Sequence, residues 1–223
     1  MRTRRKSGVE TQKPAQVRPT AALDPNRLST LDQIFSAVIL AGGNSSRMGR
    51  DKAWLEVDGQ RLLARQLDRV RAAGAAEVFI SGRADTNYSE FSGQVVRDQF
   101  AGAGPLAGIE RALAATTSPL LLVLAVDLAA MGADFLRRLM ARCPPQVGVV
   151  PRVNGRLEPL AAIYPKSAHA LARAQLENGK FAVRDFAERC GQLGFSRFIE
   201  LPARESPHFA NWNSPAELKP GTN

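Results

Sequence analysis

Along most of this chain, short apolar runs alternate with segments in which apolar residues recur at helical spacing. Ile34 to Leu40, Glu77 to Ser81 and Gln94 to Arg97 have the length and composition of strands, and Pro119 to Val126 is the longest nearly continuous apolar run. An unbroken apolar run is typical of a strand that is buried on both faces, as in the middle of a parallel sheet. The pattern therefore predicts a sheet whose central strand lies within residues 119–126.

Helical patterns separate these strands. Apolar residues recur every three or four positions between 62 and 70, and Gly74 marks the expected helix end. A second helix is expected over Leu106 to Ala115, entered through the glycine-rich sequence AGAGPLAG. Strands that alternate with helices predict an α/β fold with a three-layer, doubly wound, mostly parallel, Rossmann-like sheet. In such sheets ligands bind at the carboxyl ends of the strands.

The second half of the chain departs from this alternation. Val147 to Arg152 and Arg156 to Tyr164 flank Asn154-Gly155, a dipeptide that favours a tight hairpin because both residues tolerate positive φ. We therefore expect an antiparallel hairpin to be added to the sheet. Further on, Ser214-Pro215-Ala216-Glu217 has the chemistry of a helix start.

Charge is concentrated at the N-terminus. The 223 residues carry a net charge of +9, and seven basic against two acidic residues give the first 30 a net charge of +5. This segment is rich in proline and lacks periodic apolar residues, so we expect residues 1–32 to be a disordered basic extension and residues 33–220 a single domain. Nucleic-acid binding is not expected, because no aromatic residues are interleaved with these charges.

Other features suggest a soluble cytoplasmic protein, either a monomer or a weak oligomer. No apolar run is long enough to span a bilayer, and no signal-peptide pattern is present. Cys143 and Cys190 lie far apart in the sequence, which suggests reduced thiols. His169 and His208 stand alone and are expected to be solvated.

The sequence LAGGNSSRMGRDK, from Leu40 to Lys52, follows the first strand directly. Gly42 and Gly43 allow close approach of a ligand, and their amides could point at anionic oxygens. Arg47 and Lys52 would add positive charge for a triphosphate. The segment matches neither the Walker A pattern nor GxGxxG, so it indicates a phosphate site of another kind.

Two aspartates are expected at the same edge of the sheet. Asp127 follows the most apolar strand, and Asp98 ends another. One carboxylate in this position can hold Mg²⁺, whose remaining ligands are usually water and substrate phosphates. Together with the glycine-rich segment, the aspartates predict a pocket for a nucleotide and magnesium.

These residues resemble a known family. The chain contains LAGG-x-S-x-R-M-G-x-D-K, an aspartate closing the third strand, GPLAG, an aspartate closing the long apolar strand, and a late N-x-N-S-P-x-E-L. This ordered set, from about Ile34 to Leu218, is similar to that of the molybdenum cofactor guanylyltransferases. The resemblance implies transfer of GMP from GTP to the terminal phosphate of molybdopterin bearing molybdenum, with release of pyrophosphate and with Mg²⁺ as cofactor.

The resemblance also implies roles for individual residues. Catalysis would depend on Arg47, Lys52 and Asp127, with Asp127 binding the metal. Ser81 stands where the family tends to have an asparagine that faces the nucleoside. The implied nucleotide contacts are Leu40, Ala41, Gly42, Gly43, Lys52, Ser81, Asp98, Gly104, Gly108 and Asp127, and the acceptor contacts are Asn211, Asn213 and Arg184.

Two alternatives remain open at this stage. The first is a cytidylyltransferase of the same fold acting on the same pterin, although cytidine-using relatives typically have LAAG where this chain has LAGG. The second is a non-catalytic nucleotide-binding module with a basic tail, which the presence of Lys52 and Asp127 argues against. Molybdoenzymes or their chaperones are further expected partners. The segment Glu158 to Tyr164 resembles a substrate-facing strand of the family, and Glu158 has no assigned role.

Overall fold

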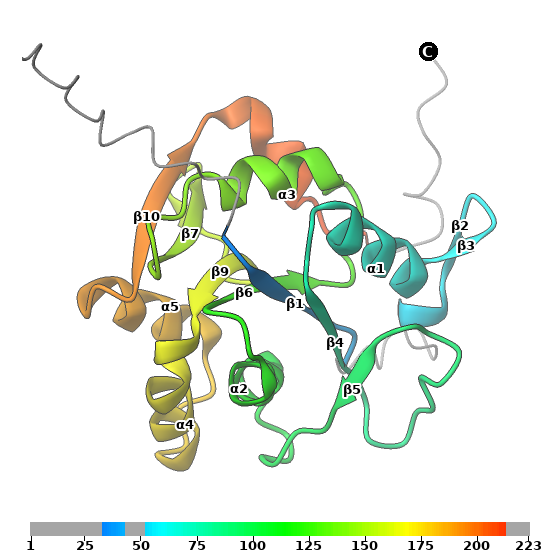
Figure 1. Ribbon diagram of the computed structural model, residues 1–223, viewed down its shortest axis with the longest axis horizontal. Helices are drawn as coiled ribbons and strands as arrows, with labels where there is room; N and C mark the ends of the chain where they lie inside the picture. The colour runs from blue at the N-terminus through cyan, green and yellow to red at the C-terminus, as the bar shows by residue number, and fades with distance from the viewer. Residues whose placement is uncertain (1–32, 43–51, 213–223) are drawn as a thin grey trace, which may run out of the picture.

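A computed structural model describes residues 33–42 and 52–212, which form three layers around one large sheet (Figure 1). The strands follow the order β10-β7-β9-β6-β1-β4-β5, and β8 pairs with β7. Four neighbouring strands are mutually parallel: β5 (Gln94–Val96), β4 (Glu77–Ser81), β1 (Phe35–Leu40) and β6 (Leu120–Ala125). The predicted α/β fold with a mostly parallel sheet is confirmed.

The other half of the sheet contains one reversed strand. β9 (Ala161–Pro165) lies between β6 and β7 (Gly148–Val153) and is antiparallel to both. β10 (Ser196–Leu201) extends the sheet parallel to β7. A separate two-stranded hairpin, β2 (Glu56–Val57) with β3 (Gln60–Arg61), precedes the first helix.

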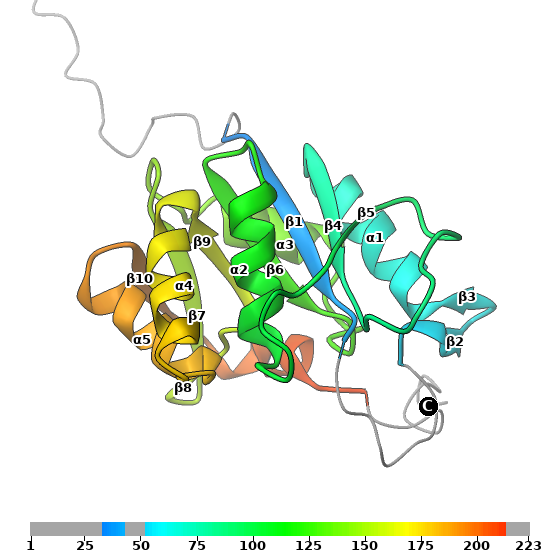
Figure 2. The same cartoon turned by 90° about the horizontal axis from the view of Figure 1, so that it is seen from below.

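Helices cover both faces of the sheet. α1 (Leu62–Ala72) and α3 (Ala133–Met140) lie on one face. The other face carries α2 (Pro105–Ala115), α4 (His169–Glu177) and α5 (Val183–Gln192), which stand in front of the sheet in Figure 2. Three short 3₁₀ segments complete the described chain: η1 (Lys52–Trp54), η2 (Lys166–Ala168) and η3 (Ala203–Phe209).

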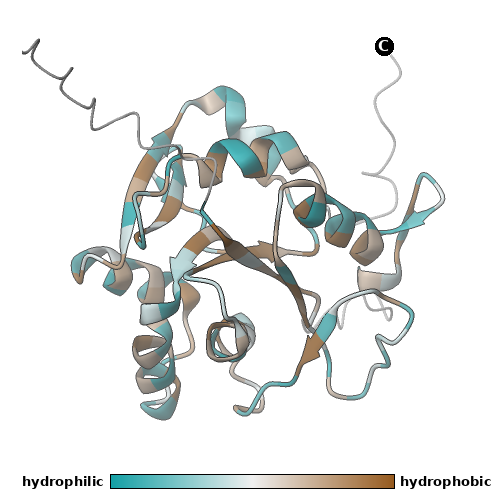
Figure 3. Ribbon diagram, viewed as in Figure 1, coloured by the Kyte–Doolittle hydropathy of each residue, from teal (hydrophilic) through white to brown (hydrophobic). Residues whose placement is uncertain are grey.

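The core is divided between these two faces. Every residue of β1 and β6 is buried, and alternate side chains enter the core under α1 and α3 or the core under α2, α4 and α5. Figure 3 shows the hydrophobic colour running along these central strands. Burial on both faces explains why their sequences are almost uninterrupted apolar runs.

The Asn154-Gly155 turn forms as predicted, with φ of 48° and 75°. The second arm of the hairpin is not one strand, however. It pairs with β7 over β8 (Arg156–Leu157), breaks, and continues as β9. The break includes Pro159, which has no amide hydrogen to donate to a ladder. Glu158, the first residue of this break, lines a cavity.

Other expectations lie outside the described residues or were incomplete. The basic extension and the helix start at Ser214 belong to segments that the structure does not describe, so the proposed domain limits stay a prediction. The sequence reasoning did not assign α3, α4, α5 or β10. Within residues 33–42 and 52–212, none of the helices has the length and apolar character needed to cross a membrane.

Candidate active site

Lys52 and Asp127 meet at the carboxyl edge of the sheet. Lys52 opens η1 and Asp127 follows β6, and the lysine Nζ lies 3.0 Å from the aspartate Oδ2. Their side chains are only 18% and 21% exposed. The amide of Val126 donates to the Leu40 carbonyl at 3.1 Å, which attaches the end of β6 to the end of β1. The structure therefore brings together two residues that the sequence assigned to catalysis.

The end of β1 is held by the end of β4. The amides of Ala41 and Gly42 both donate to the Ser81 carbonyl, at 2.7 and 3.0 Å. The Gly42 amide thus donates to the Ser81 carbonyl, and its contact with a phosphate stays a prediction. Gly42 also permits close approach of two loops, since a Cβ there would lie 3.3 Å from the Gly82 carbonyl carbon. Gly43 and Arg47 lie outside the described residues.

Ser81 connects the sheet to α2 and to Asp98. Gly108 lies inside α2, where a Cβ would come within 2.1 Å of the Ser81 hydroxyl oxygen. The same hydroxyl hydrogen-bonds to the Asp98 carboxyl. A residue without a side chain at position 108 is thus what allows Ser81 to stand between the helix and Asp98.

The environment of Asp98 shifts the pKa of its carboxyl group upward. Although the residue is exposed at the rim, desolvation of the carboxyl raises its pKa, and Glu110 adds to this effect. The hydrogen bond from Ser81 and the charge of Arg111 act in the opposite direction without cancelling the shift. Asp98 is therefore a carboxyl group that hydrogen-bond donors of a ligand would stabilise as the anion.

A cavity of about 620 Å³ lies between these elements. It is lined by the ends of β1 and β4, by residues 95–98 and by the loop that enters α2, including Leu40, Gly42, Ser81, Asp98 and Gly104. Gly104 caps α2 with a φ of 67°, a conformation that a side chain would strain. The volume falls in the range of small-molecule sites. Most of the predicted nucleotide contacts that the structure describes thus line one cavity.

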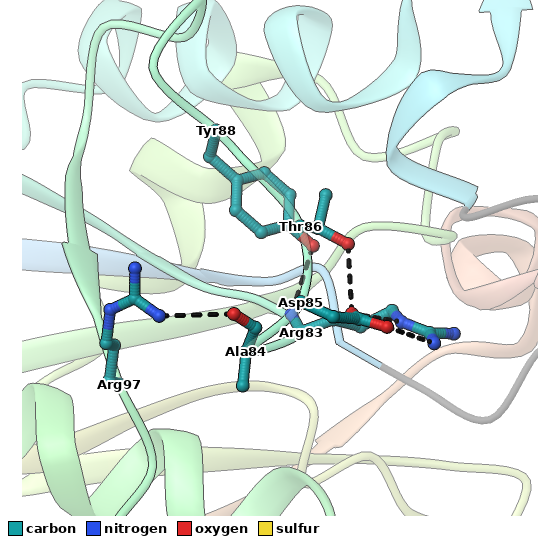
Figure 4. Close-up of polar contacts among 6 residues, drawn as sticks. All are labelled: Arg83, Ala84, Asp85, Thr86, Tyr88 and Arg97. Carbon is teal, nitrogen blue, oxygen red and sulfur yellow. Dashed lines mark hydrogen bonds and ion pairs between the residues drawn. The ribbon is translucent and has the colours of Figure 1, made fainter.

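The sequence reasoning missed Arg83, Asp85 and Arg97, which line this cavity and whose polar contacts Figure 4 draws. Arg83 donates two hydrogen bonds to Asp85, both 3.0 Å long, and holds the pKa of Asp85 below its usual value. Tyr88 is buried and accepts the Arg83 amide at 3.1 Å, and Arg97 donates to the Ala84 carbonyl at 3.2 Å. No local pattern marks Tyr88, whose partner is a backbone amide five residues earlier.

The sequence suggested that both histidines are solvated, but each contacts other residues in the structure. His169 Nε2 lies 2.7 Å from the buried Glu110 carboxyl. His208 Nδ1 lies 3.1 Å from the Ala130 carbonyl, and its Nε2 lies 3.2 Å from Glu205. Two of these three partners, Glu110 and Ala130, are distant in the sequence, and Glu205 lies three residues before His208, so single-residue reasoning did not find them.

A second cavity, of about 570 Å³, lies between the β7–β8 turn and residues 203–210. Asn211 follows this lining segment directly, and the amide of Trp212 donates to the Asp127 carbonyl at 2.9 Å. Asn213 lies outside the described residues. Arg184 is on α5, pairs with Glu188 at 3.0 Å and lines neither of these two cavities. The structure thus brings Asn211 near Asp127 and places Arg184 in the lining of a separate cavity, with Arg152 and Glu200.

The residues at this edge fit a magnesium ion only if a substrate shares its coordination. Among residues 33–42 and 52–212, no group of three or more His, Cys, Asp or Glu side chains is arranged to hold a metal. Asp127 offers a hard carboxylate oxygen that is partly open to solvent, and Lys52 accompanies it. Mg²⁺ commonly takes one or two carboxylates and completes its shell with water and phosphate oxygens.

Comparison with known proteins agrees with this geometry. The family model of the MobA-like NTP transferase domain matches residues 37–193. A probable molybdenum cofactor guanylyltransferase from Opitutus terrae is 40% identical over 82% of this chain and 92% of its own length. One from Pelotomaculum thermopropionicum is 38% identical over 82% and 89%.

A solved structure supports the fold. Molybdopterin-guanine dinucleotide biosynthesis protein A from Archaeoglobus fulgidus has a TM-score of 0.65, with 22% identity, over 82% of this chain and 94% of that one. At this identity the likeness concerns the fold, whereas the family model and the two relatives concern the sequence. The chain therefore belongs to the MobA-like NTP transferase family, in agreement with its resemblance to the molybdenum cofactor guanylyltransferases.

Proposed function

We propose that this protein transfers a guanylyl group from GTP to the terminal phosphate of molybdopterin carrying molybdenum. An oxygen of the acceptor phosphate bonds to the α-phosphorus of GTP, the bond from that phosphorus to the bridging oxygen breaks, and pyrophosphate leaves. The observation that carries the proposal is the Lys52–Asp127 pair beside a cavity of nucleoside size. Family membership and the names of the relatives support this donor and acceptor.

The reaction needs no basic residue to activate the acceptor. A phosphate monoester is mostly dianionic at neutral pH, because its second pKa is about 6. The protein must instead align two polyanions and neutralise the charge that develops on the α-phosphate and on pyrophosphate. Lys52 provides a mobile positive charge for this purpose, and Asp127 keeps the lysine at the carboxyl edge before the nucleotide binds.

Asp127 would also hold Mg²⁺ together with phosphate oxygens of the nucleotide. When bound, the ion supplies positive charge to the phosphates and so favours departure of pyrophosphate. Lys52, which contacts Oδ2 of Asp127, would supply further positive charge to the same phosphates. Arg47 stays a predicted contributor to the same charge.

The base site favours guanine. Guanine presents an N–H and an amino group side by side, and the Asp98 carboxylate can accept hydrogen bonds from such donors. The sequence LAGG supports guanylyl rather than cytidylyl transfer, because cytidine-using relatives typically have LAAG at these positions. The expected location is the cytoplasm, where GTP is supplied and where Cys143 and Cys190, both free, stay reduced.

A thermal-shift titration with GTP, CTP and ATP, each with and without Mg²⁺, tests the donor. A ligand that binds the native state at 100 times its Kd stabilises it by about 2.7 kcal/mol. We expect Mg-GTP to raise the Tm most and the Asp127→Asn variant to lose the magnesium-dependent part. Selective stabilisation by CTP would favour the cytidylyltransferase alternative. No response to any nucleotide would contradict nucleotide transfer.

A further inference from the structure

The cavity between the β7–β8 turn and η3 has a distinct chemical character. Arg156 and Glu158 line one side, while Ser206 and Phe209 line the other. Among the described residues of this lining, Glu158 alone carries a carboxylate. The cavity shares no lining residue with the cavity that contains Asp98. It is therefore a second site with its own carboxyl group and an aromatic wall.

Hydrogen bonds fix this cavity next to Asp127. The Glu158 amide donates to the Pro151 carbonyl at 2.9 Å, and the Leu160 carbonyl accepts the amide of Ala125, at the end of β6, at 2.9 Å. The opposite wall continues into Trp212, whose amide donates to the Asp127 carbonyl. Both walls are thus attached within two residues of Asp127. A ligand in this cavity would lie beside the proposed reaction centre.

Within residues 33–42 and 52–212, no group donates a hydrogen bond to the Glu158 carboxyl group. Glu158 is half-buried, and no described residue forms an ion pair with it. Burial raises the pKa of Glu158, and the nearby charge of Arg156 only partly opposes this. A carboxylate that loses water without gaining donors is stabilised when a ligand supplies them. The backbone on both sides of Glu158 is fixed, so the group is placed before a ligand arrives.

We propose that Glu158 determines acceptor specificity by accepting two hydrogen bonds from the 2-amino-4-oxopyrimidine edge of the acceptor's pterin. This inference rests on the proposed function. The pterin edge carries a ring N–H beside an amino group, a pair of donors that matches the two oxygens of one carboxylate. Phe209 offers an aromatic surface for the flat pterin ring. Guanine has the same edge, so Asp98 and Glu158 would serve as equivalent acceptors in separate cavities.

The test compares two ligands that differ only in this edge. The probes are 6-hydroxymethylpterin monophosphate and its 2-oxo counterpart, 6-hydroxymethyllumazine monophosphate, titrated into the full chain by ligand fluorescence. Lumazine replaces the amino donor with a carbonyl that faces the carboxylate, so we expect the wild type to bind the pterin about tenfold or more tightly. Glu158→Gln is expected to abolish or reverse this preference, because an amide presents one donor and one acceptor. Glu177→Gln, at an exposed glutamate of α4, is the matched control and keeps the preference.

Several results would overturn the inference. The first is equal binding of the two probes by the wild type. The second is a preference for the pterin that survives in Glu158→Gln. The third is a Glu158→Gln protein that loses stabilisation by Mg-GTP but still binds the pterin. The last result would place Glu158 in the nucleotide site. The same preparations are assayed for Mg-GTP stabilisation and for transfer to molybdopterin. If Mg-GTP stabilisation and transfer are present while Glu158→Gln keeps the preference for the pterin, the proposed function is supported and the proposed role of Glu158 is wrong. If they are absent from the wild type, the proposed function fails on its own evidence.

Discussion

Carboxyl groups at the amino edge and at the carboxyl edge of the sheet differ in how fully they are hydrogen-bonded. At the amino edge, Ser36 of β1, Glu77 of β4 and Thr116 form a closed network with Ser118. Glu77 accepts hydrogen bonds from Ser36 at 2.6 Å and from the Thr117 amide at 2.9 Å. At the carboxyl edge of the same strands, the Asp98 carboxyl has a hydrogen bond from Ser81 and opens to a cavity.

The pKa shifts of these two carboxyl groups express this difference. Desolvation acts to raise the pKa of Glu77, but hydrogen bonds from Ser36, Thr117 and Thr116 outweigh it and hold the pKa at about 2. Desolvation raises the pKa of Asp98, and its donors do not compensate. The amino edge satisfies its polar groups internally and so contributes stability. The carboxyl edge leaves polar groups for a ligand to satisfy, which is the usual condition of a functional site.

The largest effect is expected at the Lys52–Asp127 pair. Lys52→Ala should lower the rate of guanylyl transfer by about 10²–10³-fold, because it removes a positive charge aimed at the phosphates. The free energy of unfolding should fall by about 1–3 kcal/mol, since the Asp127 side chain is only 21% exposed and loses this partner. Steady-state transfer assays and thermal melts measure the two quantities.

Lys166→Ala is the control, because Lys166 is an exposed lysine of η2. It should leave both quantities unchanged. Transfer at the wild-type rate in Lys52→Ala would remove Lys52 from the reaction.

A substitution at Gly108 should affect both stability and binding. Gly108→Ala places a Cβ 2.1 Å from the Ser81 hydroxyl oxygen and 3.1 Å from Leu40 Cδ2, and we expect destabilisation by about 1–3 kcal/mol. Nucleotide affinity should also fall, because Ser81 must move away from Asp98. Chemical denaturation and GTP titration measure these changes.

Gly132→Ser adds a Cβ where no atom lies within 4 Å, and serine is a favoured helix cap. We expect its stability to stay within about 0.5 kcal/mol of the wild type. A Gly108→Ala protein as stable as this control would contradict the close packing of α2 on Ser81.

At the amino edge, the expected effect concerns stability alone. Glu77→Ala leaves the donors of Ser36, Thr116 and Thr117 without their acceptor and should cost about 1–3 kcal/mol at pH 7. The folded-state pKa of Glu77 lies below its ordinary value of 4.5, so its contribution is complete above about pH 4.5 and is lost as the pH falls toward 2. Urea denaturation at several pH values should show a weaker acid dependence in the variant. A Glu77→Ala protein with unchanged stability but impaired transfer would contradict the assignment of stability to the amino edge and of function to the carboxyl edge.

The smallest effect is expected for Ser81→Ala. Removing the hydroxyl should raise the pKa of Asp98 further, because the Ser81 hydrogen bond lowers it. Loss of one such hydrogen bond should weaken GTP binding by about two- to tenfold. A carbon-13 NMR titration of the Asp98 carboxyl measures the first change, and calorimetry measures the second. An unchanged Asp98 pKa would show that Ser81 does not position this group.

Much of the fold could be predicted because it depends on continuous apolar runs. β1, β4, β5 and β6 fall within about two residues of their predicted limits. The signal is strongest for β1 and β6, in which every residue is buried. The reversed strand β9 was predicted only as part of a hairpin, because its insertion between β6 and β7 depends on long-range pairing. Local pattern contains no information on which distant strand will be a neighbour.

The site was predictable where residues end strands. Asp98 and Asp127 follow β5 and β6, and the parallel arrangement brings them to one edge. The contact of Lys52 with Asp127 confirms one consequence of that reasoning. The hydrogen bond from the Gly42 amide to the Ser81 carbonyl and the one from the Arg83 amide to the Tyr88 hydroxyl are tertiary contacts. The spacing of residues in the sequence does not predict them.

The most direct test of this account is the acceptor-dependent release of pyrophosphate by the full chain. Molybdopterin carrying molybdenum is supplied with Mg²⁺ and with GTP, CTP or ATP, and the guanylylated product is quantified beside pyrophosphate. The account predicts release with GTP in a 1:1 ratio to product, and its loss in Lys52→Ala and Asp127→Asn. Equal or greater release with CTP, or no acceptor-dependent release with GTP, would contradict it.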